Sequence, residues 1–205
     1  MDAQRHTRIR VGTLLCLAAF LGVPDGSGGL QAAASGGAAE IGAVPLGLPP
    51  VEYPADNPQT PAKIALGEKL FMDARFSSTG EVSCSTCHDP KKVFTDSPLK
   101  VSEGIFKLTG TRNAPTVVNA AYMQTQFWDG RSPSLEDQAL HPPVNPVEMG
   151  LKDHQPILDI VRTDPEYVQQ FKEVFGKSGE AVTMTEVTQA IAAFERTIIS
   201  GNSPF

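Results

Sequence analysis

The chain has 205 residues, of which 40% are hydrophobic, and carries a formal net charge of −6 at pH 7. This balance is typical of a globular protein and argues against nucleic acid as a partner, because nucleic-acid-binding chains are usually basic. With only three cysteines, a framework of structural disulfides is excluded. The 18 glycines and 17 prolines predict short helices and many loops.

Residues 1–39 have the pattern of an export signal. Arg5, Arg8 and Arg10 precede an apolar run over 11–23, and a small-residue stretch over 32–39 follows as a cleavage region. The apolar run is shorter than the about 20 residues of a transmembrane span, although an uncleaved anchor remains an alternative. Cys16 lies inside this run and would be removed with it. We therefore predict export to the periplasm.

The rest of the chain shows helical signals and no comparable alternating pattern for strands. From Asp25 to Leu48 the chain is rich in Gly, Ala and Ser, and five prolines follow between 49 and 61, which predicts a linker and an extended lead-in over residues 40–60. Beyond it, capping residues and apolar stripes predict five helices. They begin at Pro61 after Thr60, at Ser132 (ending before His141), around Ile157–Val161, at Pro165 (ending at Gly176), and after Thr183 (ending at Gly201). The predicted fold is mainly α.

The segment Cys84-Ser-Thr-Cys87-His88 is typical of covalent haem attachment. Two thiols at this spacing can add to the haem vinyl groups, and the adjacent imidazole can ligate the iron. A zinc site would need four ligands, but His141 and His154 stand alone. A thioredoxin-type redox pair would need a βαβ setting. We therefore predict one haem c, attached at Cys84 and Cys87 with His88 as axial ligand, inside a cytochrome c-like helical domain with short helices and long loops over residues 61–205.

Four further motifs surround the haem motif in a fixed order. They are LGEKLFMDARFS at 66–77, RNAPT at 112–116, FWDGR at 127–131 and NPVEMG at 145–150. Together, over residues 45–205, they resemble the N-terminal half of the bacterial di-haem cytochrome c peroxidases and their MauG relatives. The resemblance implies a peroxidatic haem domain that reduces hydrogen peroxide to water with electrons from a small cytochrome c or cupredoxin. A MauG-like protein-modifying oxidase and a simple electron-transfer cytochrome remain alternatives.

The resemblance also assigns roles to individual residues. Glu148 and Gln138 fall at the positions of the family's distal glutamate and glutamine, where a carboxylate can move a proton between the peroxide oxygens and an amide can orient the peroxide. Trp128, by default a core aromatic, is implied to lie between two haems and to carry charge. Asn113, otherwise a turn residue, is implied as a calcium ligand, and Arg75 as a haem contact.

Two departures from the family pattern matter. No histidine lies between His88 and His141, so we expect an iron that is five-coordinate or water-ligated and ready for peroxide. Met123 and Met149 are alternative distal ligands.

The family also continues into a second haem domain beyond a segment similar to residues 198–205. We expect that domain either on a separate chain or missing, in which case calcium binding at Asn113 would lack its remaining ligands.

Overall fold

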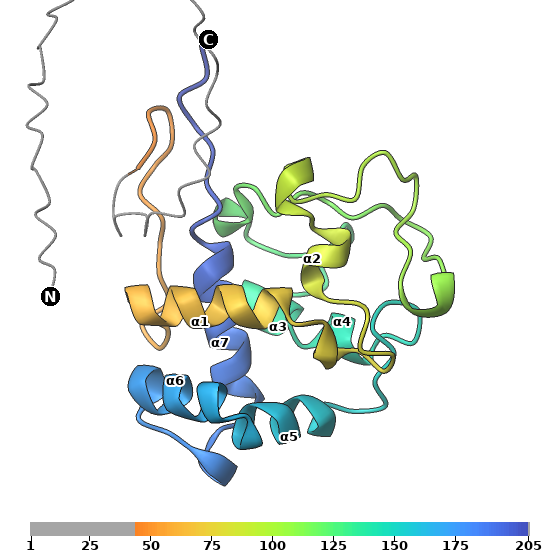
Figure 1. The fold of residues 1–205 in the computed structure, drawn as a ribbon. Helices are drawn as coiled ribbons and strands as arrows, with labels where there is room; N and C mark the ends of the chain where they lie inside the picture. The colour runs from red at the N-terminus through yellow and green to blue at the C-terminus, as the bar shows by residue number, and fades with distance from the viewer. Residues whose placement is uncertain (1–43, 205) are drawn as a thin grey trace, which may run out of the picture. The chain divides into compact units, whose positions relative to one another are not determined.

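The computed structural model describes residues 44–204 (Figure 1), and the predicted export signal lies outside these residues. From 44 to 60 the chain forms turns and irregular backbone before the first helix. The described residues contain helices and three isolated β-bridges but no strand, so the prediction of a mainly α fold is confirmed. None of the helices between 44 and 204 combines the length and the apolar character needed to cross a bilayer.

The α-helices of this part are α1 (Pro61–Met72), α2 (Cys84–Cys87), α3 (Leu135–Gln138), α4 (His141–Val144), α5 (Gln155–Thr163), α6 (Pro165–Phe175) and α7 (Met184–Glu195). Short 3-10 turns occur at Ala74–Phe76, Pro90–Lys92, Ile105–Lys107, Ala120–Tyr122 and Gly179–Ala181. Between α2 and α3 the chain consists largely of loops, which are drawn in green in Figure 1.

Local capping explains why the longer helices begin where they do. The Thr60 hydroxyl accepts a hydrogen bond from the Lys63 amide, and Pro61 occupies the first turn, where a missing N–H costs nothing. At the start of α6, the Asp164 carboxylate accepts from the Glu166 amide. Thr183 and Glu186 form the expected capping box of α7. The predicted starts of these three helices are therefore confirmed.

The predicted helix from Ser132 is wrong in detail. The Ser132 backbone instead bridges to Gln126, with the Gln126 amide donating to the Ser132 carbonyl at 2.7 Å. Ser134 then caps α3 by accepting from the Asp137 amide. The separate helix α4 begins at His141, where we expected the preceding helix to have ended, because its prolines lie in a first turn that needs no amide donors.

The predicted end of α7 at Gly201 is also wrong, because the helix stops at Glu195. Asn119 forms hydrogen bonds with backbone groups of the residues that follow the helix. Its backbone amide donates to the Ile198 carbonyl at 2.9 Å, and its side chain both donates to the Ser200 carbonyl and accepts from the Ser200 amide. These long-range bonds replace the intrahelical ones, and they hold the end of the chain against the loop that carries Asn119.

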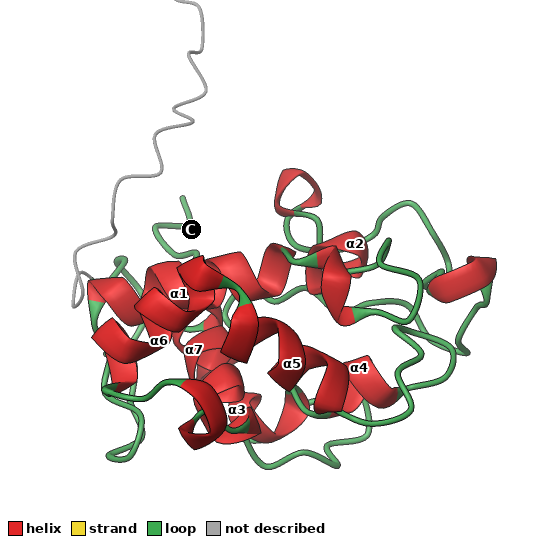
Figure 2. Cartoon of the chain, turned by 60° about the horizontal axis from the view of Figure 1, so that its bottom comes forward, coloured by secondary structure: helices red, strands yellow, loops and turns green. Residues whose placement is uncertain are grey.

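The core lies where α1 crosses α7, with α5 and α6 packed alongside (Figures 1 and 2). These helices supply most of the deeply buried side chains, among them Leu66, Leu70, Phe71, Ile157, Val161, Tyr167, Phe171, Val187 and Ala190. Close approach of α1 and α7 depends on Gly67, because a Cβ built there would collide with the Ala190 carbonyl. The crossing also brings Phe194 of α7 onto Phe71 of α1, with ring centroids 5.3 Å apart.

We expect Gly67→Ala to lower the free energy of unfolding by about 1–3 kcal/mol, the usual cost of overpacking a core. The added methyl group would force α1 away from the Ala190 carbonyl. Thermal unfolding followed by circular dichroism measures this loss. Gly110→Ala is the matched control, because a Cβ at Gly110 meets nothing within 4 Å. Equal melting temperatures for the two variants would contradict the close packing of the two helices.

Candidate functional site

The one-turn helix α2 presents the two thiols. Ser83 precedes it, and its amide donates to the Thr86 hydroxyl at 3.0 Å, which fixes the turn. Residues three apart on a helix lie on the same side, so Cys84 and Cys87 face the same region. His88 follows directly as the C-terminal cap, with its amide bonded to the Cys84 carbonyl at 2.9 Å. The structure therefore brings the three residues of the predicted haem motif together.

Both cysteines are free thiols in an apolar setting, and Cys84 packs against the hydrophobic core. Burial, followed by the nearby Glu195, Cys87 and then Glu148, raises the pKa of Cys84 to about 12. Burial, together with Asp96 and then Glu148, raises the pKa of Cys87 to about 11. Raised pKa values keep both thiols protonated at neutral pH, so they are poor nucleophiles there. A redox-active pair depends on a lowered thiol pKa instead.

His88 is held with one ring nitrogen available. Its Nδ1 lies 3.3 Å from the Phe94 carbonyl, and its ring contacts Phe71 with centroids 6.4 Å apart. Burial lowers the pKa of the imidazole, which favours the neutral form that binds metals. With Nδ1 donating to a carbonyl, Nε2 carries the free lone pair. An imidazole in this state suits an iron ligand.

The turn that supplies the Phe94 carbonyl is conformationally unusual. Val93 and Phe94 both have positive φ, 58° and 54°, which L residues rarely adopt. The Thr116 hydroxyl donates to the Val93 carbonyl at 2.6 Å and helps to hold the turn.

The residues present fit a covalently attached haem. Two thiols lie at the attachment spacing, a neutral imidazole is oriented by its second nitrogen, and the nearby buried Asp96 Oδ2 has no hydrogen-bond partner among the described residues.

Other metal sites are less well supported by the geometry. Among residues 44–204 no group of three or more His, Cys, Asp or Glu side chains is arranged to hold a metal ion. The absence of strands from the same part of the chain leaves no βαβ unit for a thioredoxin-type pair. Haem attachment is the chemistry that this arrangement suits best.

Glu148 is linked to Cys87 of the haem motif through the segment Glu103–Ile105. The Glu103 carbonyl is 3.9 Å from Cys87 Sγ, and two residues later the Ile105 amide donates to the Glu148 carbonyl at 2.9 Å. Asn145 Nδ2 donates to Glu148 Oε1 at 2.7 Å and orients the carboxyl group. Burial raises the pKa of Glu148, and the charges of Arg131 and His141 partly offset this effect. A half-buried carboxyl group with a raised pKa is suited to proton transfer.

Gln138 is the last residue of α3, a helix that is held in place through Glu136. Arg196, the residue that caps the C-terminus of α7, forms a two-pronged ion pair with Glu136, with nitrogen–oxygen distances of 2.7 and 2.8 Å. Asn57 also donates to Glu136, at 2.7 Å. Gln138 is half-buried, and its backbone amide donates to the Ser134 carbonyl at 3.0 Å, whereas no hydrogen bond joins its side-chain amide to another described residue. No described interaction joins Gln138 to Glu148, so their joint role stays a prediction.

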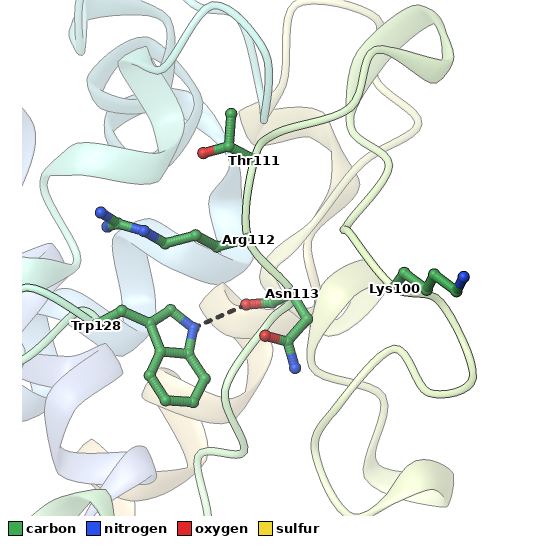
Figure 3. A pocket seen from close by; sticks show the side chains of 5 residues that line it. All are labelled: Lys100, Thr111, Arg112, Asn113 and Trp128. Carbon is green, nitrogen blue, oxygen red and sulfur yellow. Dashed lines mark hydrogen bonds between the residues drawn. The ribbon is translucent and has the colours of Figure 1, made fainter.

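Trp128 and Asn113 lie together at the surface, where Trp128 Nε1 donates to the Asn113 carbonyl at 3.0 Å (Figure 3). They line an open hollow of about 420 Å³. Trp128 is 60% exposed, so the default expectation of a core aromatic is wrong. Asp129 beside it accepts from Arg112 and Arg131, and these guanidinium groups lower its pKa to about 2.

The remaining candidates have other surroundings. The Arg75 guanidinium donates to Asp73 and to Asp164, so it already ties α1 to the start of α6, and its haem contact stays a prediction. Met149 is buried in the core at 3% exposure, whereas Met123 is 53% exposed. Their role as alternative distal ligands is likewise untested.

Several residues of the site were not among those predicted from the sequence. Phe94 contributes a backbone carbonyl, which carries no side-chain signal. Asn145 belongs to the NPVEMG motif, so its hydrogen bond to Glu148 could have been suspected from that motif alone. Asp96 and Glu195 become notable only through burial, at 4% and 6% exposure.

Comparison with known proteins supports this description. The family model described as di-haem cytochrome c peroxidase matches residues 61–205. The methylamine utilization protein MauG of Methylorubrum extorquens is 40% identical over 155 residues, which cover 76% of this chain and 43% of that protein. The cytochrome c peroxidase Ccp of Escherichia coli is 42% identical over 154 residues, or 74% of this chain and 32% of that protein.

A solved structure agrees with the fold. The crystal structure of a MauG-like protein associated with microbial copper homeostasis matches with a TM-score of 0.70 and 34% sequence identity. The match covers 77% of this chain and 46% of the chain in that crystal structure. The chain thus spans less than half the length of each of these relatives. A helical, cytochrome c-like domain, the haem motif and the family match agree with one another, and the chain therefore belongs to the di-haem cytochrome c peroxidase family.

Proposed function

We propose that this chain is the peroxidatic haem domain of a periplasmic c-type haem peroxidase, which reduces hydrogen peroxide to water with electrons from a small cytochrome c or cupredoxin. The observation that carries the proposal is the pairing of the haem motif with Glu148, which is linked to Cys87 through the segment Glu103–Ile105. An attachment site with an oriented, half-buried carboxyl group beside it is more than electron transfer needs.

The residues would divide the work as follows. Cys84 and Cys87 hold the haem through thioether bonds, and His88 Nε2 ligates the iron. When bound, the haem supplies the redox-active iron at which peroxide is reduced. Glu148 accepts a proton from one peroxide oxygen and delivers it to the other, and Asn145 keeps the carboxyl group oriented for both transfers.

Gln138 and Trp128 would act around this exchange. The side-chain amide of Gln138, which has no hydrogen bond to another described residue, would orient peroxide. Trp128 is exposed at the surface and can pass oxidising equivalents to a partner, either a second haem domain or a separate donor. Asn113 lies beside Trp128 and would be a calcium ligand where a second haem domain meets this one.

The same exposed tryptophan favours one alternative, a MauG-like oxidase that modifies a protein substrate. In that case the oxidising equivalents would leave through Trp128 to aromatic residues of a bound protein. A change in mass of those aromatic residues after addition of peroxide would identify this activity.

Optical and electron paramagnetic spectra of the haem-loaded ferric protein test the proposal. We expect a high-spin ferric spectrum, because no histidine occupies the stretch between His88 and His141, and we expect it to change on addition of one equivalent of peroxide. A low-spin spectrum that peroxide leaves unchanged would instead identify a simple electron-transfer cytochrome, with Met123 or Met149 as the first ligands to test.

A further inference from the structure

Glu195 on α7 is a buried acid that the proposed reaction does not use. It is 6% exposed, and its Oε2 has no hydrogen-bond partner among the described residues. Glu186 on the same helix is equally buried, at 5% exposure, but it bonds to Lys177 Nζ at 2.6 Å and to the Thr183 amide at 2.8 Å. Burial without a partner is costly for a carboxylate, so Glu195 calls for a different explanation from Glu186.

The charged groups around Glu195 are committed elsewhere. Arg196, the next residue, directs its guanidinium to Glu136 on α3. Lys63 of α1, which belongs to the same buried network, donates to Asn57 Oδ1 and to the Pro58 carbonyl. Burial raises the pKa of Glu195 to about 8, an effect that Arg196 reduces and Glu136 reinforces. At neutral pH the carboxyl group therefore holds a proton, which it can release under mildly alkaline conditions.

Glu195 also lies within electrostatic reach of the haem attachment site. Phe194, the residue before it, packs on Phe71, and the Phe71 ring contacts the His88 ring. A negative charge on Glu195 is, after burial, the next cause of the raised pKa of the Cys84 thiol. Cys84 packs on the same core that contains Ile191 and Phe194 of α7. In such a setting charges are weakly screened, so a charge change on a group bonded to the Cys84 sulfur would be felt at Glu195.

We infer that Glu195 is a redox-linked proton site, which takes up a proton at its carboxylate when the haem attached at Cys84 gains an electron. A donor protein supplies the electron to ferric iron, water supplies the proton, and reoxidation returns both. The charge of the buried region then stays constant through the redox cycle, which avoids the cost of an uncompensated charge. This inference rests on the haem attachment in the proposed function but not on peroxide as the substrate.

Potentiometric titration of the haem-loaded protein over the pH range around 8 tests this coupling, with Glu195→Gln compared with wild type. For the wild type, the reduction potential should fall as pH rises, by at most about 59 mV per pH unit for one proton and one electron. Glu195→Gln stays neutral at every pH, so its potential should be nearly flat in this range and should exceed the wild-type value on the alkaline side. Equal slopes in the two proteins would overturn the inference.

The matched control is Glu186→Gln, because Gln can replace Glu in a capping box and Glu186 is buried on the same helix. This variant should keep the wild-type slope. Redox-induced infrared difference spectra of the wild type provide a second test that needs no folded variant. At mildly alkaline pH, reduction should produce the C=O band of a protonated carboxylic acid, and its absence would overturn the inference.

The outcome does not depend on the success of the proposed peroxidase activity. A pH-dependent potential that Glu195→Gln abolishes, in a protein inert to peroxide, would support the redox-linked site and reject the peroxidase. If the protein reacts with peroxide but its potential has the same pH slope in wild type and Glu195→Gln, the peroxidase is supported and the redox-linked site is rejected.

Discussion

Replacing both cysteines, Cys84→Ala with Cys87→Ala, is expected to abolish covalent haem binding completely. Each thioether bond needs one of these thiols, and no other cysteine lies among the described residues. Expression in a host with a cytochrome c maturation system, followed by denaturing electrophoresis and a haem stain, measures the result. The wild type should stain at the mass of the chain, and the double variant should not.

Two further variants sharpen this experiment. Cys16→Ser is the matched control, because Cys16 lies in the predicted export signal, and it should leave haem attachment unchanged. His88→Ala keeps both thiols, so it should retain covalent haem but change the ferric spectrum through loss of the axial imidazole. A haem-staining double cysteine variant would show that attachment uses other residues.

The second large effect is expected for Glu148→Gln, which should slow the reaction with peroxide by about a hundredfold or more, the usual scale of general acid–base catalysis. The amide keeps the shape and the hydrogen bond from Asn145 but cannot accept a proton. Stopped-flow absorption after mixing the ferric protein with peroxide measures the rate. Glu180→Gln is the control, because the Glu180 side chain is 90% exposed in a surface ion pair with Arg162.

The pH dependence of the same rate provides an independent check. Burial raises the pKa of Glu148 above its ordinary value, and the carboxylate form must accept the first proton. The wild-type rate should therefore fall as the pH decreases through this raised pKa, at a higher pH than for an exposed glutamate. In Glu148→Gln this decrease should disappear. An unchanged rate and profile in the variant would remove Glu148 from the mechanism.

Much of the fold could be predicted because helix boundaries at N-termini are set locally. Thr60, Asp164 and Thr183 each accept hydrogen bonds from amides two or three residues ahead, and such short-range signals are readable in the sequence. The haem motif is equally local, because its two thiols and imidazole lie within five consecutive residues.

The errors arose where distant residues compete with local signals. Asn119 ends α7 early through bonds to residues about 80 positions away along the chain. Trp128, for which a single tryptophan's default place is the core, lies instead on an exposed loop with its indole bonded to the Asn113 backbone, and its predicted role in electron transfer stays a prediction. Neither outcome can be read from periodicity, because both depend on which segments meet in space.

The sequence by itself determined the haem motif, the helical class and the family, because each depends on residue types at short, fixed spacing. The tertiary structure alone decided which acids matter around that motif. Glu148 is linked to Cys87 through the loop at Glu103–Ile105, and Glu195 is removed from solvent because α7 is packed among other helices. The physical reason is that burial and electrostatic coupling depend on three-dimensional neighbours, and these neighbours are contributed by segments far apart in the chain.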